Sequence, residues 1–78
     1  MMNADKITEH MPVVGSDGEH LGTVDHVDGQ RIKLTKSDPM SGGVHHYINL
    51  DMVQSVDTAV RLSLPAAQAR MEWVSEGV

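Results

Sequence analysis

The chain has 78 residues, a formal net charge of -5 and no cysteine. A domain of this size buries only about 60 to 65% of its unfolded surface, so we expect self-association to supplement a marginal core. The missing cysteine excludes disulfides, thiolate metal sites and a cysteine nucleophile, and the acidic balance opposes binding to nucleic acid.

The N-terminal residues 1–11 carry no basic flank followed by an apolar stretch of signal-peptide length. No window approaches the roughly 18 apolar residues of a membrane helix. We therefore expect a cytoplasmic protein without membrane insertion. The polar start of the chain is compatible with one helical turn beginning near Asn3 or Asp5.

Strands are favoured by the apolar composition of the chain. Phenylalanine is absent, and Tyr47 and Trp73 are the only aromatic residues, so the core must consist of Val, Ile, Leu and Met. Many of these side chains are β-branched and pack well on a pleated surface. The first strand is predicted over residues 11–15, before a turn in which Asp17 bonds local backbone and Gly18 adopts a positive φ.

The second predicted strand, His20–Asp28, breaks strict alternation. Leu21 and Val27 share one parity, whereas Val24 has the other. A bulge near Gly22 reconciles them, because one inserted residue reverses the side-chain parity.

The next segments follow from turn signals and alternation. Asp28 and Gly29 predict a hairpin turn into a strand over residues 31–35 with Ile32 and Leu34 facing inward. Residues 36–43 contain a proline and a glycine pair, which predicts an exposed loop before a strand over residues 44–50.

The last third of the chain predicts two short strands and a helix. After a tight turn over residues 50–53, strands are expected over 54–56 and 59–64. Pro65 suits the first position of a helix, which we expect to end near Val74. The helix carries two neighbouring apolar stripes: Leu64, Ala67, Met71 and Val74 form one, and Ala66, Ala69 and Trp73 form the other.

Six short strands followed by one helix predict a mainly β fold. We expect a single domain over residues 1–78, with a small antiparallel barrel over about 11–64 and a C-terminal helix over about 65–74. Closure into a barrel removes sheet edges at this size.

Several segments resemble the PRC-barrel superfamily. The matching segments are Met-Pro-Val-Val at 11–14, Asp-Gly-Glu-His-Leu-Gly-Thr-Val at 17–24, Ile-Lys-Leu at 32–34, Ile-Asn-Leu at 48–50 and Val-Arg-Leu at 60–62. Within that group the chain looks most like a compact bacterial family of unknown function. PRC-barrel domains in the photosynthetic reaction centre H subunit and in a ribosome maturation factor dock other macromolecules. The resemblance therefore implies a binding or assembly role and carries over no catalytic residue.

Histidine is the one residue type that suggests a metal. The five histidines are His10, His20, His26, His45 and His46. His45 and His46 are adjacent in a predicted strand and point to opposite faces, so only one of them can join His26 in a site. The competing interpretation is that His26 and His46 hydrogen-bond backbone or nearby aspartates. A metal- or pH-responsive binding protein using His26, His45 and His46 is our alternative function, and no cofactor is expected otherwise.

Enzymatic signals are weak. The serines lie in predicted turns without a Gly-x-Ser-x-Gly elbow, and the glycine-rich turns lack a phosphate-binding lysine. Arg31, Lys33 and Lys36 form a modest basic stripe, and Tyr47 near it could stack on the bases of RNA. A solvated face fits the acidic balance of the chain better. We expect a protein that is not an enzyme.

An interaction surface is predicted from the exposed apolar candidates. Aromatic anchors dominate interfaces, so Trp73 leads the set, with packing of Trp73 on its own chain as the alternative. The predicted interface residues are Trp73, Met71, Val74, Tyr47, Asp38 and Met40. We expect a homo-oligomer, with a homodimer as the simplest form, or a protein partner.

Overall fold

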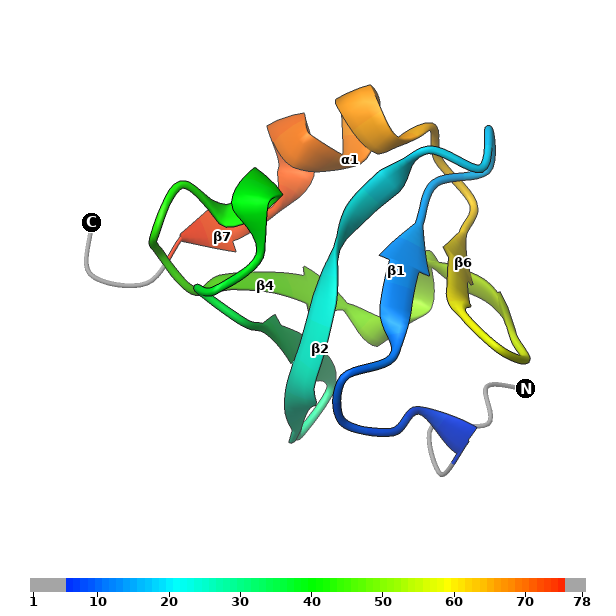
Figure 1. The fold of residues 1–78 in the computed structure, drawn as a ribbon. Coiled ribbons are helices and arrows are strands. Elements are labelled where there is room, and N and C mark those ends of the chain that lie inside the picture. The colour runs from blue at the N-terminus through cyan, green and yellow to red at the C-terminus, as the bar shows by residue number, and fades with distance from the viewer. Residues whose placement is uncertain (1–5, 76–78) are drawn as a thin grey trace.

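The computed structural model describes residues 6–75, which form a mainly β structure with one short α-helix (Figure 1). The strands are β1 (Pro12–Val14), β2 (His20–Asp28), β3 (Arg31–Leu34), β4 (His46–Asn49), β5 (Val53–Val56), β6 (Val60–Leu62) and β7 (Val74–Ser75). The helices are the 3-10 turns η2 (Pro39–Ser41) and η3 (Leu50–Met52) and the α-helix α1 (Ala66–Glu72). The helical turn predicted near Asn3 or Asp5 lies outside the described residues.

The sheet formed within residues 6–75 is mixed and open. Its hydrogen-bonded order is β5-β6-β1-β2-β3-β4-β7. Strands β1 and β6 run parallel, whereas the other neighbours are antiparallel. The mainly β prediction is confirmed, but a closed antiparallel barrel of six strands is wrong: within the described residues the sheet has seven strands, and its two end strands, β5 and β7, do not pair with each other. No helix of this described part is long and apolar enough to cross a membrane.

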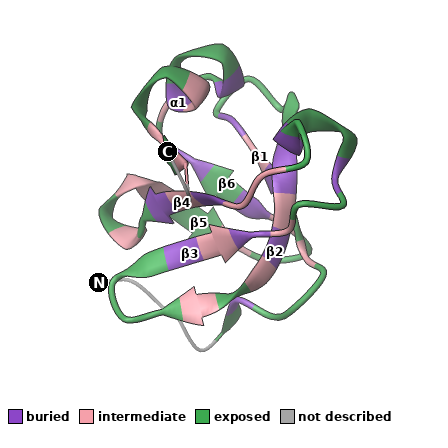
Figure 2. Cartoon of the chain, turned by 90° about the vertical axis from the view of Figure 1, so that its left-hand side faces the viewer, coloured by how far each residue is buried: buried purple, intermediate pink, exposed green. Residues whose placement is uncertain are grey.

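The core is aliphatic and lies on the inner side of the curled sheet, and α1 covers one end of this sheet (Figure 1). Buried and exposed positions alternate along the strands, as the colouring in Figure 2 shows. Ile32 and Leu34 are buried at 0% and 1% exposure, which confirms the inward face predicted for this strand. The other core strand residues are Val13, Leu21, Val24, Ile48, Val60 and Leu62.

Strand β2 changes register twice. In the pairing of β2 with β1, Leu21 has no partner residue on β1. This irregularity lies directly before Gly22, near which the sequence predicts a bulge. The pairing of β2 with β3 skips Asp25. The extra residues change the side-chain parity along the strand, which lets Leu21 and Val24 both face the core.

The helix α1 ends earlier than predicted. Trp73 already has an extended backbone, with φ -72° and ψ 157°, and Val74 pairs with Tyr47 as part of β7. Of the two apolar stripes, the one with Ala66 and Ala69 is buried. The helix predicted to end near Val74 ends at Glu72, and Val74 adds to the sheet instead.

The turn before β2 is joined to the start of α1. Asp17 Oδ1 accepts hydrogen bonds from the backbone N–H of Glu19 at 3.2 Å and of Ala66 at 3.3 Å. Pro65 at the N-cap supplies no side-chain hydrogen bond, so Asp17 replaces the missing cap from a distant part of the chain. A Cβ at Gly15 would overlap the backbone of Pro65 and Ala66, so this junction requires glycine.

We predict that Asp17→Ala lowers the thermal unfolding temperature more than Asp57→Ala does. Both aspartates accept a local backbone bond two residues on, but only Asp17 also bonds the start of α1. Thermal unfolding followed by circular dichroism measures the difference. Equal shifts for the two variants would show that the bond to Ala66 contributes nothing.

Candidate functional site

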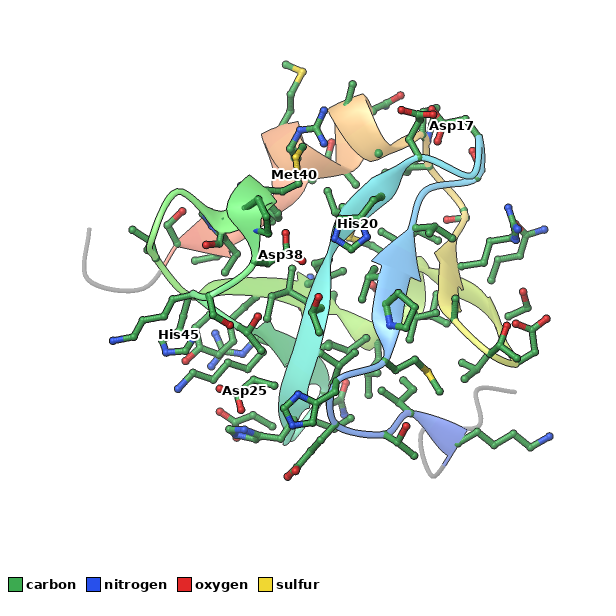
Figure 3. The ribbon with its side chains drawn as sticks, in the orientation of Figure 1. Asp17, His20, Asp25, Asp38, Met40 and His45 are labelled. Atoms are coloured by element: carbon green, nitrogen blue, oxygen red, sulfur yellow. The ribbon has the colours of Figure 1, made fainter. Side chains whose placement is uncertain are left out.

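A buried carboxylate organises the loop between β3 and β4. The Asp38 side chain is 3% exposed. Its Oδ2 accepts hydrogen bonds from the Thr23 hydroxyl and from His20 Nε2, both at 2.7 Å, and its Oδ1 accepts one from the Met40 N–H at 2.8 Å. Figure 3 shows His20 of β2 and Asp38 of the loop facing each other.

The bulge in β2 helps to create this arrangement. In a regular strand, residues three apart point to opposite faces, yet His20 and Thr23 both donate to Asp38 Oδ2. The residue inserted at Leu21 restores a common side. The same bulge therefore serves the core and the polar site.

The hydrogen bonds keep Asp38 ionised. Burial raises the pKa of the Asp38 carboxyl, but the bonds from Thr23, Met40 and His20 outweigh this effect and lower the pKa below its usual value. A carboxylate only accepts hydrogen bonds, so His20 Nε2 carries the proton in this contact. The His20 side chain is 44% exposed, and its Nδ1 has no partner among the described residues.

The loop over residues 36–43 is tied down by Ser41 as well. The buried Ser41 hydroxyl lies 2.7 Å from the carbonyls of Lys36 and Asp38 and accepts the Gly43 N–H at 3.1 Å. Asp38 caps the turn η2, which starts with a proline. The loop lies where it was predicted, but Asp38 and Ser41 in it are buried rather than exposed, and its residues Pro39–Ser41 form a 3-10 turn.

A buried imidazole connects this loop to the C-terminal segment. His46 Nε2 lies 2.8 Å from the Ser41 carbonyl, which only accepts, so Nε2 donates. His46 Nδ1 lies 2.8 Å from the Ser75 hydroxyl. The indole of Trp73 stacks on the ring with centroids 3.8 Å apart and an interplanar angle of 6°. Trp73 therefore packs on its own chain, as the alternative interpretation expected.

The histidines proposed as metal ligands fall into two groups. His26 and His45 lie near Asp25, with His26 Nδ1 3.5 Å from Asp25 Oδ1 and His45 Nδ1 3.9 Å from Asp25 Oδ2. His45 Nδ1 donates to the Leu34 carbonyl at 2.8 Å and is thereby occupied. His46, the first residue of β4, is buried, whereas His45, directly before the strand, is half-buried.

The structure thus separates His46 from His26 and His45. Both ring nitrogens of His46 already have hydrogen-bond partners on η2 and β7. Within residues 6–75, no group of three His, Asp or Glu side chains is arranged to hold a metal ion.

The predicted interface residues also divide by exposure. Met71, Val74 and Met40 are the exposed large hydrophobic residues of the described chain, at 85%, 58% and 40%. Asp38 instead points inward and holds the loop. Tyr47 is half-buried, and the Arg31 guanidinium lies 4.3 Å from its ring centroid.

Arg31 and Lys33 do accompany Tyr47, as the basic stripe predicted. Lys33 lies opposite Tyr47 in the pairing of β3 with β4, and its Nζ is 6.0 Å from the ring centroid. Arg31 also lies 3.9 Å from Asp28, so its charge is partly compensated. Both contacts with the Tyr47 ring are cation–π interactions at the protein surface.

Sequence reasoning missed the roles of His20 and Thr23. The available signal was Asp38 directly before Pro39, a sequence typical of a capped turn. The partners of its second oxygen come from another strand, and the sequence alone does not place that strand beside the loop.

We predict that Asp38→Asn destabilises the fold by about 1.5 to 3 kcal/mol at pH 7, the usual cost of removing hydrogen bonds to a charged group. Because the folded pKa is lowered, the ionised carboxyl stabilises the fold fully above its unfolded value near 3.8. This stabilisation is lost as the pH falls through the lower folded pKa. The free energy of unfolding, measured with urea, should therefore differ less between Asp38→Asn and the wild type in acid than at pH 7.

The matched control for that measurement is Asp28→Asn. It removes the same charge from an exposed carboxylate whose nearest basic atom, on Arg31, is 3.9 Å away. A surface pair of this kind contributes about 0 to 1 kcal/mol. If both variants lost the same free energy of unfolding, the hydrogen bonds of Asp38 would contribute no more than an exposed charge does.

Comparison with known protein families matches residues 7–70 to the family described as "Uncharacterized protein conserved in bacteria (DUF2171)". The chain belongs to this family, which confirms the expected relationship to a bacterial family of unknown function. Comparisons with curated proteins and with solved structures give no match.

Proposed function

We propose that this member of the DUF2171 family is a non-enzymatic binding or assembly module that self-associates as a homodimer. The observation that carries the proposal is the exposure of Met40, Met71 and Val74, called here the methionine surface. Large apolar side chains that remain in solvent mark interaction sites when the segments carrying them lie together.

His46 brings those segments together. It bonds the Ser41 carbonyl of η2, stacks on Trp73 and bonds Ser75 of β7. Met40 directly precedes the first of these residues, and Val74 lies between the other two. Figure 1 shows η2, α1 and β7 in the same upper part of the molecule. Methionine is a flexible, polarisable side chain that adapts to the shape of a partner.

The open sheet supports association further. Strand β7 ends the sheet of the described residues with two residues only, and Val74 in it is 58% exposed. Unpaired sheet edges are favourable positions for contact with another chain. A contact that covers β7 and the neighbouring methionines would bury an edge and an apolar surface at once.

The kinship with the PRC-barrel superfamily is part of this proposal. It is supported by the residue resemblance along residues 11–62 and is compatible with a mainly β fold that has one C-terminal helix. The docking role of that superfamily agrees with the methionine surface. The alternative of a metal- or pH-responsive protein built on His26, His45 and His46 has less support, since only His26 and His45 lie near Asp25 and both ring nitrogens of His46 have other hydrogen-bond partners.

We predict that Met71→Glu weakens self-association about 10- to 100-fold. Burying a methionine contributes about 1.5 to 3 kcal/mol, and each 1.4 kcal/mol corresponds to a factor of ten in the equilibrium constant. Sedimentation equilibrium over a wide range of concentrations measures the dimerisation constant of the wild type and the variant.

Gln54→Glu is the matched control, because it places the same charge at an exposed position of β5, at the opposite end of the sheet from β7. It should leave the association constant close to that of the wild type. A wild-type chain that remains monomeric at millimolar concentration would overturn the proposal. If both substitutions weakened self-association equally, the methionine surface would not be the dimer contact.

A further inference from the structure

His20 and Met40 are held next to each other by one carboxylate. Asp38 Oδ2 accepts His20 Nε2 at 2.7 Å, and Asp38 Oδ1 accepts the Met40 N–H at 2.8 Å. The imidazole and the methionine backbone are therefore each one hydrogen bond away from the two oxygens of the same group. Figure 3 shows the three labelled side chains in one region, with Met40 above Asp38 and His20 beside it.

The contact with Asp38 fixes which nitrogen of His20 is available. Nε2 carries the proton, so in the neutral ring Nδ1 holds an unshared electron pair. This atom has no hydrogen-bond partner among the described residues, and the side chain is 44% exposed. A histidine that binds a metal commonly donates its other ring N–H to a carboxylate, which orients the ring and raises its basicity.

The thioether of Met40 is the second available donor. Met40 is 40% exposed, although Asp38 and Ser41 hold its backbone in an ordered turn. The Met40 side chain is unbranched and has three rotatable bonds, so its sulfur can adapt its position to a bound ion. Thioether sulfur is a soft ligand that selects Cu(I), and imidazole suits copper as well.

We propose that His20 Nδ1 and Met40 Sδ bind a soft monovalent cation of the Cu(I) or Ag(I) type. Asp38 orients the imidazole without touching the ion. The pair contains no thiolate and contributes no charged ligand, so it is unsuited to Mg²⁺ or Ca²⁺, which require several oxygen donors. The formal net charge of -5 lowers the electrostatic cost of adding a cation.

Silver nitrate in chloride-free buffer is the probe, because Ag(I) is stable in air and requires no reductant. We expect one ion per chain by calorimetric titration. In spectra of the protein labelled with ¹³C at its six methionine methyl groups, the Met40 resonance should shift first. The Met71 methyl, on a residue that is 85% exposed, should remain unshifted at one equivalent.

Two variants test the ligands separately. Met40→Leu removes the sulfur at similar volume from an exposed position. His20→Gln removes Nδ1 but keeps an N–H that can donate to Asp38. Each should weaken silver binding about tenfold or more, as loss of a ligand must cost at least as much as loss of an orienting group. Met71→Leu is the matched control and should bind like the wild type.

Unchanged affinity in both Met40→Leu and His20→Gln would overturn the proposal. Simultaneous shifts of the Met40 and Met71 methyl groups would do so too, since they indicate unspecific binding to exposed thioethers. The amide spectrum of each variant reports whether it is folded, and Met40→Leu alters no hydrogen bond. The site lies within one chain, so a monomeric protein serves equally well and failure of self-association does not affect this test.

Discussion

The ionised carboxylate of Asp38 is the interaction on which the loop side of this protein depends. It is almost completely buried, and it is stabilised by a hydroxyl, an imidazole and a backbone N–H that come from β2 and η2. A buried charge is tolerated only when its hydrogen bonds are made. Each hydrogen bond that is lost leaves the buried charge less compensated. The conformation in which all three bonds form is therefore favoured, and it holds the loop against the sheet.

A second polar contact extends this constraint to the C-terminus. His46 joins the end of η2 to Trp73 and to Ser75 of β7. With no phenylalanine and a core of aliphatic side chains, the chain has little apolar surface left to fix its peripheral segments. Directional hydrogen bonds and one aromatic stack perform that task instead.

Local signals predicted much of the fold. The positive φ of Gly18, the bulge beside Gly22 and the inward face with Ile32 and Leu34 each follow from a few neighbouring residues. The parallel pairing of β1 with β6 and the strand at Val74 depend on distant segments, and helix propensity around Val74 pointed the other way. Tertiary pairing overrides such local preferences.

The candidate site was harder to predict for the same reason. Strand alternation predicts opposite faces for His45 and His46, but β4 begins only at His46, and the two rings bond the carbonyls of Leu34 and Ser41 respectively. His20 was passed over, since its importance comes from Asp38, which lies 18 positions away in the sequence. A sequence identifies residue types that can meet, and only the bulge in β2 brings these side chains to one carboxylate.

The exposed methionines have different physical origins. Met71 projects into solvent from a short helix whose buried residues are Ala66 and Ala69. Met40 is exposed on a turn that Asp38 and Ser41 hold rigidly in place. A flexible loop would let an apolar side chain fold back toward the core, and the hydrogen bonds of the Asp38 carboxylate and the Ser41 hydroxyl hold the turn against this. Of the exposed side chains invoked in the two proposals, Met40 is therefore the one whose backbone is fixed by a buried carboxylate.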